Sequence, residues 1–298
     1  QIVLQKKINR AAIRERYLSL HDFSKARVAP FRAFPLLTPW AEESQALPLK
    51  TLEKRIVNVL KQLLNQQDRV SLIVLLHSLV NSKGLFVLGG LAPNTLMPKS
   101  WIPQLLEVVK TQLRARNPAL RGAAITFLGH SRSKSARKHL MAALNDSDSP
   151  VRIAAINALA KFSTASTISK LLNAIQEGPA GNTWQERVSI AQTLKALAPH
   201  DANRYGIKRL AQYLNDTFAL VRIAACQAIQ QYGNAALVHS PKLVSLLKDP
   251  DLNVVLAALA ALGTVKDSKS TTVIKQLTQA ANPRKRAAAK QTLKLINN

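Results

Sequence analysis

Apolar and small side chains recur along this chain at the spacing of a helix rather than that of a strand. Between residues 151 and 162 they are Val151, Ala154, Ala155, Ala158, Leu159 and Phe162. The same spacing returns at Val221, Ala224, Ala225, Ala228 and Ile229. Steps of three and four residues place these positions on one stripe of an α-helix. Alanine in the middle of the stripe lets a neighbouring helix approach closely, so we expect these helices to pack side by side.

The segments that carry this stripe also repeat one another in sequence. Residues 151–159 read VRIAAINAL and residues 221–229 read VRIAACQAI. Looser copies have their arginine at Arg121, Arg187 and Arg286, whereas a further copy has Val255 at that position. The aligned positions are 121, 152, 187, 222, 255 and 286, at intervals of 31 to 35 residues. Self-similarity at such a period predicts stacked supersecondary units rather than one globular core.

Each repeated segment follows a polar turn, and each turn follows a second amphipathic stretch. The turns contain asparagine, aspartate and proline, as in residues 146–150 and 249–251, and these residues favour turns and helix N-termini. The amphipathic stretches before the turns are 135–144, 168–175, 207–214, 243–247 and 273–277. The predicted unit is therefore helix, turn, helix. A single pair cannot cover its own apolar face, so we expect successive pairs to stack.

The turn residues and the V-R-x-x-A-x-x-A-L second helix, over roughly residues 101–298, resemble the HEAT repeat family. The resemblance implies an all-α fold, a right-handed α-α superhelix (a HEAT-like solenoid) of about six to seven helix pairs. It also implies that a turn acid pairs with a helix arginine across neighbouring repeats. Asp148 with Arg152 and Asp216 with Arg222 would fill that role. Because Val255 replaces the arginine, we expect a less uniform stack near the fifth repeat.

Changes of composition along the chain predict three regions. Residues 1–49 hold a basic helix and a proline- and aromatic-rich extended segment that would form an irregular N-terminal cap on the solenoid. Residues 50–100 hold a degenerate helix pair followed by an insertion loop. Residues 101–298 hold the clear repeat array, with a longer linker at 177–183.

The charge of the chain points to the class of partner. The 298 residues include 42 lysines and arginines against 16 aspartates and glutamates, a net charge of +26. The excess is spread over the whole chain rather than gathered in a tail. Solubility needs far less charge than this, and a field of one sign attracts polyanions. The leading interpretation is a non-catalytic binding scaffold that engages an anionic macromolecule, above all the backbone of RNA or DNA, through a basic edge.

Basic residues recur near the starts of the expected first helices, which would align them along one edge of the solenoid. Together with basic residues of the last helix, they form the candidate anion-binding set: Arg132, Lys134, Arg137, Lys138, Lys170, Arg204, Lys208, Arg209, Arg284, Lys285 and Lys290. Few aromatic residues lie between them, which favours contacts to phosphates over stacking on single-stranded bases. The other interpretation of these residues is an ordinary solvated face.

A row of amides is the second candidate surface. Five residues after the repeat arginine, four of the copies have Asn157, Gln192, Gln227 and Gln291. This position should face outward from the second helix, where evenly spaced amides can hydrogen-bond the backbone of an extended peptide, as asparagines do in armadillo-type relatives of the HEAT family. The alternative function is therefore a protein–protein adaptor that holds an acidic or extended peptide in a concave groove. The other interpretation of this row is ordinary polar helix surface.

The start of the chain adds two expectations. The sequence begins at Gln1, and several lysines and arginines follow within its first 16 positions. Cytoplasmic flanks of membrane helices are rich in such residues, so the adaptor in one version is membrane-tethered through a segment before Gln1. In the other version this segment is a basic arm that lies on a macromolecule. We expect an intracellular location, in the cytoplasm or in an organelle matrix after processing.

The sequence offers little that would support catalysis. The six histidines show no i, i+4 pairing, and the single cysteine, Cys226, occupies an apolar helix position, so we predict no metal site and no disulfide. HEAT-like alkylpurine DNA glycosylases are a third candidate class, whose resemblance would imply a carboxylate framed by tryptophans on inner helices. Only Trp184 enters a second helix here, with Glu186 beside it rather than a full turn away. We predict no enzyme activity, no cofactor and no small-molecule substrate.

Overall fold

A computed structural model describes residues 49–65, 72–73, 76, 102–162 and 164–297, and every regular element among them is an α-helix or a 3-10 helix. The chain divides into two compact units, residues 1–136 and 137–298. The predicted N-terminal cap, the second helix of the degenerate pair for the most part, and the insertion loop lie outside the described residues. No helix in the described part is both long and apolar enough to cross a membrane.

Among the described residues of the first unit are the helices α4 (Leu49–Asn65), α7 (Ile102–Lys110) and α8 (Pro118–Ser131). A 3-10 turn, η2 (Thr111–Arg114), leads from α7 into α8, and α7 packs against both α4 and α8. Asn117 caps α8 by accepting a hydrogen bond of 2.8 Å from the backbone N–H of Ala119. Phe127 on α8 is completely buried and is among the largest buried side chains of the described residues.

The second unit alternates first and second helices. The second helices are α10 (Ser149–Leu159), α12 (Trp184–Leu197), α14 (Ala219–Ile229), α16 (Leu252–Val265) and α18 (Pro283–Asn297). The first helices are α9 (Lys134–Ala143), α11 (Ala165–Glu177), α13 (Tyr205–Tyr213), α15 (Ser240–Ser245) and α17 (Thr271–Leu277). Short 3-10 helices complete it: η3 (Ala198–His200), η4 (Gln230–His239), η5 (Leu246–Lys248) and η6 (Ser268–Ser270). The predicted helix–turn–helix unit is therefore confirmed over the repeat array.

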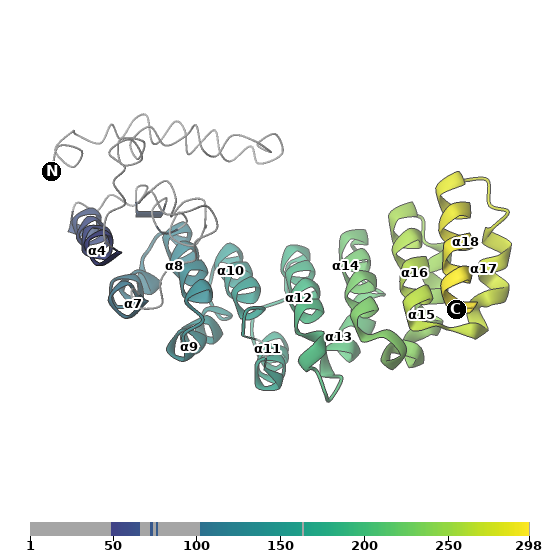
Figure 1. The fold of residues 1–298 in the computed structure, drawn as a ribbon, viewed down its shortest axis with the longest axis horizontal. Helices are drawn as coiled ribbons and strands as arrows, with labels where there is room; N and C mark the ends of the chain where they lie inside the picture. The colour runs from purple at the N-terminus through teal and green to yellow at the C-terminus, as the bar shows by residue number, and fades with distance from the viewer. Residues whose placement is uncertain (1–48, 66–71, 74–75, 77–101, 163, 298) are drawn as a thin grey trace. The chain divides into compact units, whose positions relative to one another are not determined.

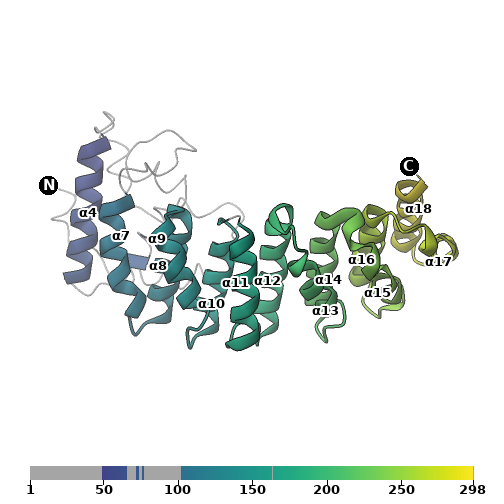
Figure 2. The same ribbon diagram turned by 90° about the horizontal axis from the view of Figure 1, so that it is seen from below.

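The second helices form a continuous row. Each of α12, α14 and α16 packs against the second helix before it and the one after it, and α10 and α18 flank this row. Figure 1 shows α10, α12, α14 and α16 in succession along one side of this unit, with α11, α13 and α15 along the other, and the order is the same in Figure 2. In α10, α14, α16 and α18 the alanine three residues after the repeat position is completely buried, namely Ala155, Ala225, Ala258 and Ala289. Small side chains at these positions permit the close packing that the sequence predicted.

The irregularity expected near the fifth repeat lies in its first helix and not in the row of second helices. Val255 is buried, and α16 packs on both α14 and α18. The first helix of that repeat, α15, has only six residues and is flanked by η4 and η5. Gly233 within η4 has a φ of 49°, which breaks the helical path before α15 begins.

The turns of this unit lie along two edges. The ladder edge is formed by the turns that precede the second helices, namely 144–148, 178–183, 214–218, 249–251 and 278–282. The inter-repeat edge is formed by the turns that follow them, namely 160–164, 198–204, 230–239 and 266–270. Because first and second helices alternate in direction, the inter-repeat edge also holds the C-terminal ends of the second helices.

Candidate functional site

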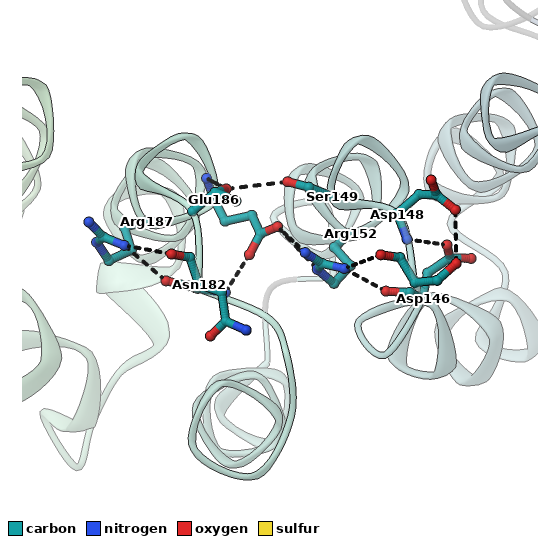
Figure 3. Close-up of polar contacts among 10 residues, drawn as sticks. Asp146, Asp148, Ser149, Arg152, Asn182, Glu186 and Arg187 are labelled. Atoms are coloured by element: carbon teal, nitrogen blue, oxygen red, sulfur yellow. Dashed lines mark hydrogen bonds and ion pairs between the residues drawn. The ribbon is translucent and has the colours of Figure 1, made fainter.

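A ladder of arginines ties neighbouring repeats together. Arg152 donates from Nη1 to the carbonyl oxygens of Asp146 and Ser147, at 2.7 and 2.9 Å. Its Nε and Nη2 donate to Oε1 of Glu186, at 3.1 and 2.7 Å (Figure 3). The guanidinium therefore closes the turn of its own repeat with one nitrogen and reaches the next repeat with the other two.

The next two arginines repeat this geometry. Arg187 donates to the carbonyl oxygens of Gly181 and Asn182 and pairs with Asp216 at 2.6 Å. Arg222 donates to the carbonyl oxygens of Asp216 and Thr217 and pairs with Asp249 at 2.8 Å. The same carbonyl bonds recur where Arg286 donates to Ala280 and Ala281, both at 2.7 Å. Two carbonyls and one carboxylate thus satisfy a planar guanidinium in three successive repeats.

The pairs predicted from the sequence, Asp148 with Arg152 and Asp216 with Arg222, are wrong. Each arginine pairs with an acid of the following repeat, because the carbonyls of its own turn take Nη1 and aim Nε and Nη2 along the stack. The partner of Arg152 is Glu186, which lies in the first turn of α12 rather than in a turn between helices. Sequence spacing alone gave no signal for that choice.

Glu186 is a structural acid. It is completely buried, and its two oxygens accept from Arg152 and from the backbone N–H of Gly181, the latter at 2.7 Å. Burial by itself raises the pKa of this carboxyl, but hydrogen bonds from Ser149, Arg152 and Gly181 outweigh it and hold the pKa below its ordinary value. Trp184 is stacked on Phe218 with ring centroids 6.0 Å apart. Both residues considered for glycosylase chemistry therefore have packing roles.

The lowered pKa of Glu186 predicts a specific loss of stability in acid. An acid whose folded pKa is depressed stabilises the fold above its unfolded pKa, which is about 4.3 for glutamate. This stabilisation is lost as the pH falls through the lower folded pKa. We expect Glu186→Gln to be less stable than the wild type at pH 7 and to lose less stability on acidification below pH ~4, as measured by urea unfolding. Equal acid dependence of the two proteins would contradict this assignment.

Several other acids of residues 137–298 also hold backbone or side-chain groups of the fold. Asp201 accepts from the backbone N–H groups of Tyr205 and Gly206, at 3.0 and 2.7 Å, and from the hydroxyl of Tyr232 at 3.0 Å. Asp251 and Asp267 each accept from a backbone N–H two residues later. Among residues 137–298 the single acidic side chain with an exposed class is Glu177, the last residue of α11.

The structure places most of the predicted anion-binding residues at the surface. The exposed ones are Arg132, Lys138, Lys170, Arg204, Lys208, Arg284 and Lys290. Arg137, Arg209 and Lys285 are half-buried, and Lys285 Nζ donates to the carbonyl oxygen of Leu247 at 3.3 Å. Lys134 is the first residue of α9.

These residues do not gather on one edge. Arg204 and Lys208 lie on the inter-repeat edge, whereas Arg284 and Lys285 begin α18 on the ladder edge. Other exposed lysines were not predicted from the sequence to bind anions: Lys195, Lys248, Lys266 and Lys294. Their position at helix ends is a signal that the sequence does contain, since cations are favoured near the C-termini of helices.

The predicted amide row does face solvent. Asn157, Gln192, Gln227 and Gln291 are exposed on α10, α12, α14 and α18. Half-buried apolar residues lie one turn before three of them, namely Ile153, Val188 and Ile223. This surface of the second helices therefore alternates amide and apolar rows.

The described residues contain no metal-binding cluster, and the single cysteine is buried. No group of three or more histidine, cysteine, aspartate or glutamate side chains comes close enough to hold a metal ion in that part of the chain. Cys226 is completely buried, and burial raises the pKa of its thiol to about 12. The thiol stays protonated at neutral pH and packs as a small apolar group, as its sequence context predicted.

Comparison with known families agrees with this architecture. The family profile for HEAT repeats matches residues 103–189 and 207–294, more than half of the 298 residues. The chain belongs to the HEAT repeat family. A search of curated proteins finds no match to this HEAT repeat protein.

Solved structures resemble the HEAT repeat protein in fold. An X-ray structure of YIBA_ECOLI has a TM-score of 0.56 and 18% identity, covering 86% of this chain and 88% of that one. Kap121p has a TM-score of 0.55 and 17% identity over 89% of this chain, which corresponds to 32% of Kap121p. An archaeal HEAT-like repeats protein from Thermococcus onnurineus NA1 has a TM-score of 0.48 and 16% identity, covering 85% of this chain and 98% of that one. Both matches above 0.5 support the helical solenoid.

Proposed function

We propose that this HEAT repeat protein is a binding scaffold for an anionic macromolecule, and that its partner is the phosphate backbone of RNA or DNA. One observation carries the proposal. Within residues 137–298 most acids are held in the arginine ladder, in helix caps and in turns: the aspartates and Glu186 are buried or half-buried, and Glu177 is the one acidic residue of the exposed class. The basic side chains outside the ladder remain largely exposed. At the surface of residues 137–298, exposed basic residues therefore greatly outnumber exposed acidic ones.

A phosphate backbone suits such a surface better than a folded acidic protein does. It offers one negative charge every few ångströms over a long path, which matches lysines and arginines distributed over several repeats. Contacts to phosphates position a protein on nucleic acid without reading its sequence. Scarce aromatic residues, 5% of the chain, give little surface for stacking exposed bases. The proposal places the protein where it meets nucleic acid, inside a cell or an organelle.

Binding should therefore depend steeply on salt and weakly on base sequence. We expect the logarithm of the association constant to fall linearly with the logarithm of salt concentration, with a slope of about −4 or steeper for roughly five phosphate contacts on duplex DNA. Fluorescence anisotropy with labelled 20-base-pair RNA and DNA duplexes, at several salt concentrations, measures this slope. Affinity that vanishes by physiological salt, or that is insensitive to salt, would overturn the proposed function.

The exposed amide row supports a second candidate function, that of an adaptor for an acidic or extended peptide. The amides are flanked by half-buried Ile153, Val188 and Ile223, which is a mixed polar and apolar surface rather than a uniformly charged one. The triple variant Asn157→Ala/Gln192→Ala/Gln227→Ala discriminates between the two functions. We expect it to bind the duplexes with unchanged affinity and salt slope. Binding of a polyglutamate peptide that exceeds duplex binding and is lost in this variant would favour the adaptor.

A further inference from the structure

Every non-glycine residue with a positive φ in the described part of the chain is basic. They are Arg132 with a φ of 49°, Arg204 with 55° and Lys266 with 56°. A left-handed backbone brings Cβ too close to the neighbouring carbonyl oxygen, so glycine or asparagine is favoured there. Each of the three sits in the segment that follows a second helix: α8, α12 and α16 respectively. In the segment after α14, the same fold uses Gly233, with a φ of 49°.

The basic side chains at these positions are not needed to build the turns. Asp201 holds the turn before α13 through the backbone of Tyr205 and Gly206, and Asp267 holds the turn before α17 through the backbone N–H of Lys269. Both aspartates are buried, with 7% and 3% of their surface exposed. Arg204 and Lys266 are exposed, and their side chains make no hydrogen bond or ion pair among the described residues. In each of these two turns the aspartate is buried and the basic residue is exposed.

The two edges of residues 137–298 consequently differ in charge. Beside Arg204 and Lys266, the exposed basic residues on or next to the inter-repeat edge are Lys195, Lys208, Lys269 and Lys294. The acids of this edge are the buried Asp201 and Asp267. The ladder edge, in contrast, contains Asp146, Asp148, Asp216, Asp249 and Asp251, and the exposed Glu177 precedes one of its turns. A polyanion lying on the ladder edge would approach the half-buried Asp146, Asp148 and Asp251 as well as the exposed Lys248 and Arg284, whereas both acids of the inter-repeat edge are buried.

We propose that the inter-repeat edge is the phosphate-binding surface, and that Arg204 and Lys266 are retained in a costly backbone conformation because their side chains contact phosphodiester groups. Unfavourable backbone conformations persist where function requires the residue that adopts them. This inference rests on the proposed function and names the edge that performs it. Arg132 lies in the other unit and is not included in this surface.

The glycine variant Arg204→Gly/Lys266→Gly tests the inference, because it should affect stability and binding in opposite ways. Glycine relieves the left-handed conformation, so we expect the melting temperature to stay the same or to rise. The loss of two phosphate contacts should lower duplex affinity on the order of tenfold or more at physiological salt and reduce the magnitude of the salt slope by about two. The conservative variant Arg204→Lys keeps the charge and should keep the slope.

The matched control removes two charges from the ladder edge. Lys248 and Arg284 are both exposed beside the turns of that edge, and Lys248→Gln/Arg284→Gln changes the net charge equally. We expect this control to change the salt slope much less than the glycine variant does. An equal or larger change in the control would overturn the assignment of the edge while leaving the proposed function intact. A lower melting temperature of the glycine variant would also overturn the assignment of the edge, because the side chains of Arg204 and Lys266 would then stabilise the fold.

Duplex binding by the wild-type protein distinguishes a failure of the proposed function from a failure of the edge assignment. If it fails to bind RNA and DNA duplexes at physiological salt, the proposed function itself falls, and the edge assignment falls with it. If it binds and the glycine variant binds equally well with an unchanged salt slope, the edge assignment alone is wrong.

Discussion

Glu186→Ala is expected to lower the free energy of unfolding by about 3–5 kcal/mol, the range for removing one partner of a buried ion pair. The cost arises because Arg152 has only 7% of its side chain exposed and would lose the acceptor of its Nε and Nη2. The backbone N–H of Gly181 would lose its acceptor as well. Urea unfolding followed by circular dichroism measures the loss.

Arg286→Ala is the matched control for this prediction. Arg286 makes the same two carbonyl bonds as Arg152, and no carboxylate pairs with it among the described residues. We therefore expect Arg286→Ala to cost about 1 kcal/mol, as for ordinary hydrogen bonds. A double-mutant cycle of Arg152→Ala and Glu186→Ala should return a coupling of ~1–3 kcal/mol. Equal losses for Glu186→Ala and Arg286→Ala would show that the ion pair adds nothing to the ladder.

Phe127→Ala is expected to cost about 3–5 kcal/mol, because it removes a large and completely buried ring from α8. Six residues after the repeat position, the later repeats have the smaller residues alanine or threonine, so this ring is particular to α8 among them. In repeat proteins a local loss of packing destabilises the repeat concerned and its neighbours first. Hydrogen exchange should therefore show faster exchange in residues 118–131 than in α14 and α16.

Phe162→Ala provides the comparison for that variant. Phe162 was assigned by sequence to the apolar stripe of its helix, but α10 ends at Leu159 and Phe162 is half-buried in the turn that follows. A half-buried ring leaves a smaller cavity when it is removed, so we expect a loss of about 1–2 kcal/mol. A loss for Phe127→Ala no larger than that for Phe162→Ala would contradict the role assigned to Phe127 in the core.

The candidate site was only partly predictable. The exposure of Lys170 and Lys208 followed from helical periodicity, and so did that of Asn157 and Gln227. The distribution of the basic residues over two edges did not follow, because a residue near a helix end belongs to either edge until the direction of that helix is known. The left-handed backbone of Arg204 and Lys266 gave no signal in the sequence, since glycine and asparagine are the usual markers of that conformation.

The repeating unit and its stacking follow from local features of the sequence. Periodicity of three and four residues, turns rich in aspartate and asparagine, and the alanines at 155, 225 and 258 are local properties, and a helix–turn–helix that cannot cover its own apolar face must pack on another. Which acid pairs with which arginine, and which charged side chains remain exposed, depends on the tertiary structure. Those outcomes depend on the offset between stacked helices. This offset brings Glu186 to Arg152, 34 residues earlier in the chain, and leaves exposed lysines and arginines on the inter-repeat edge.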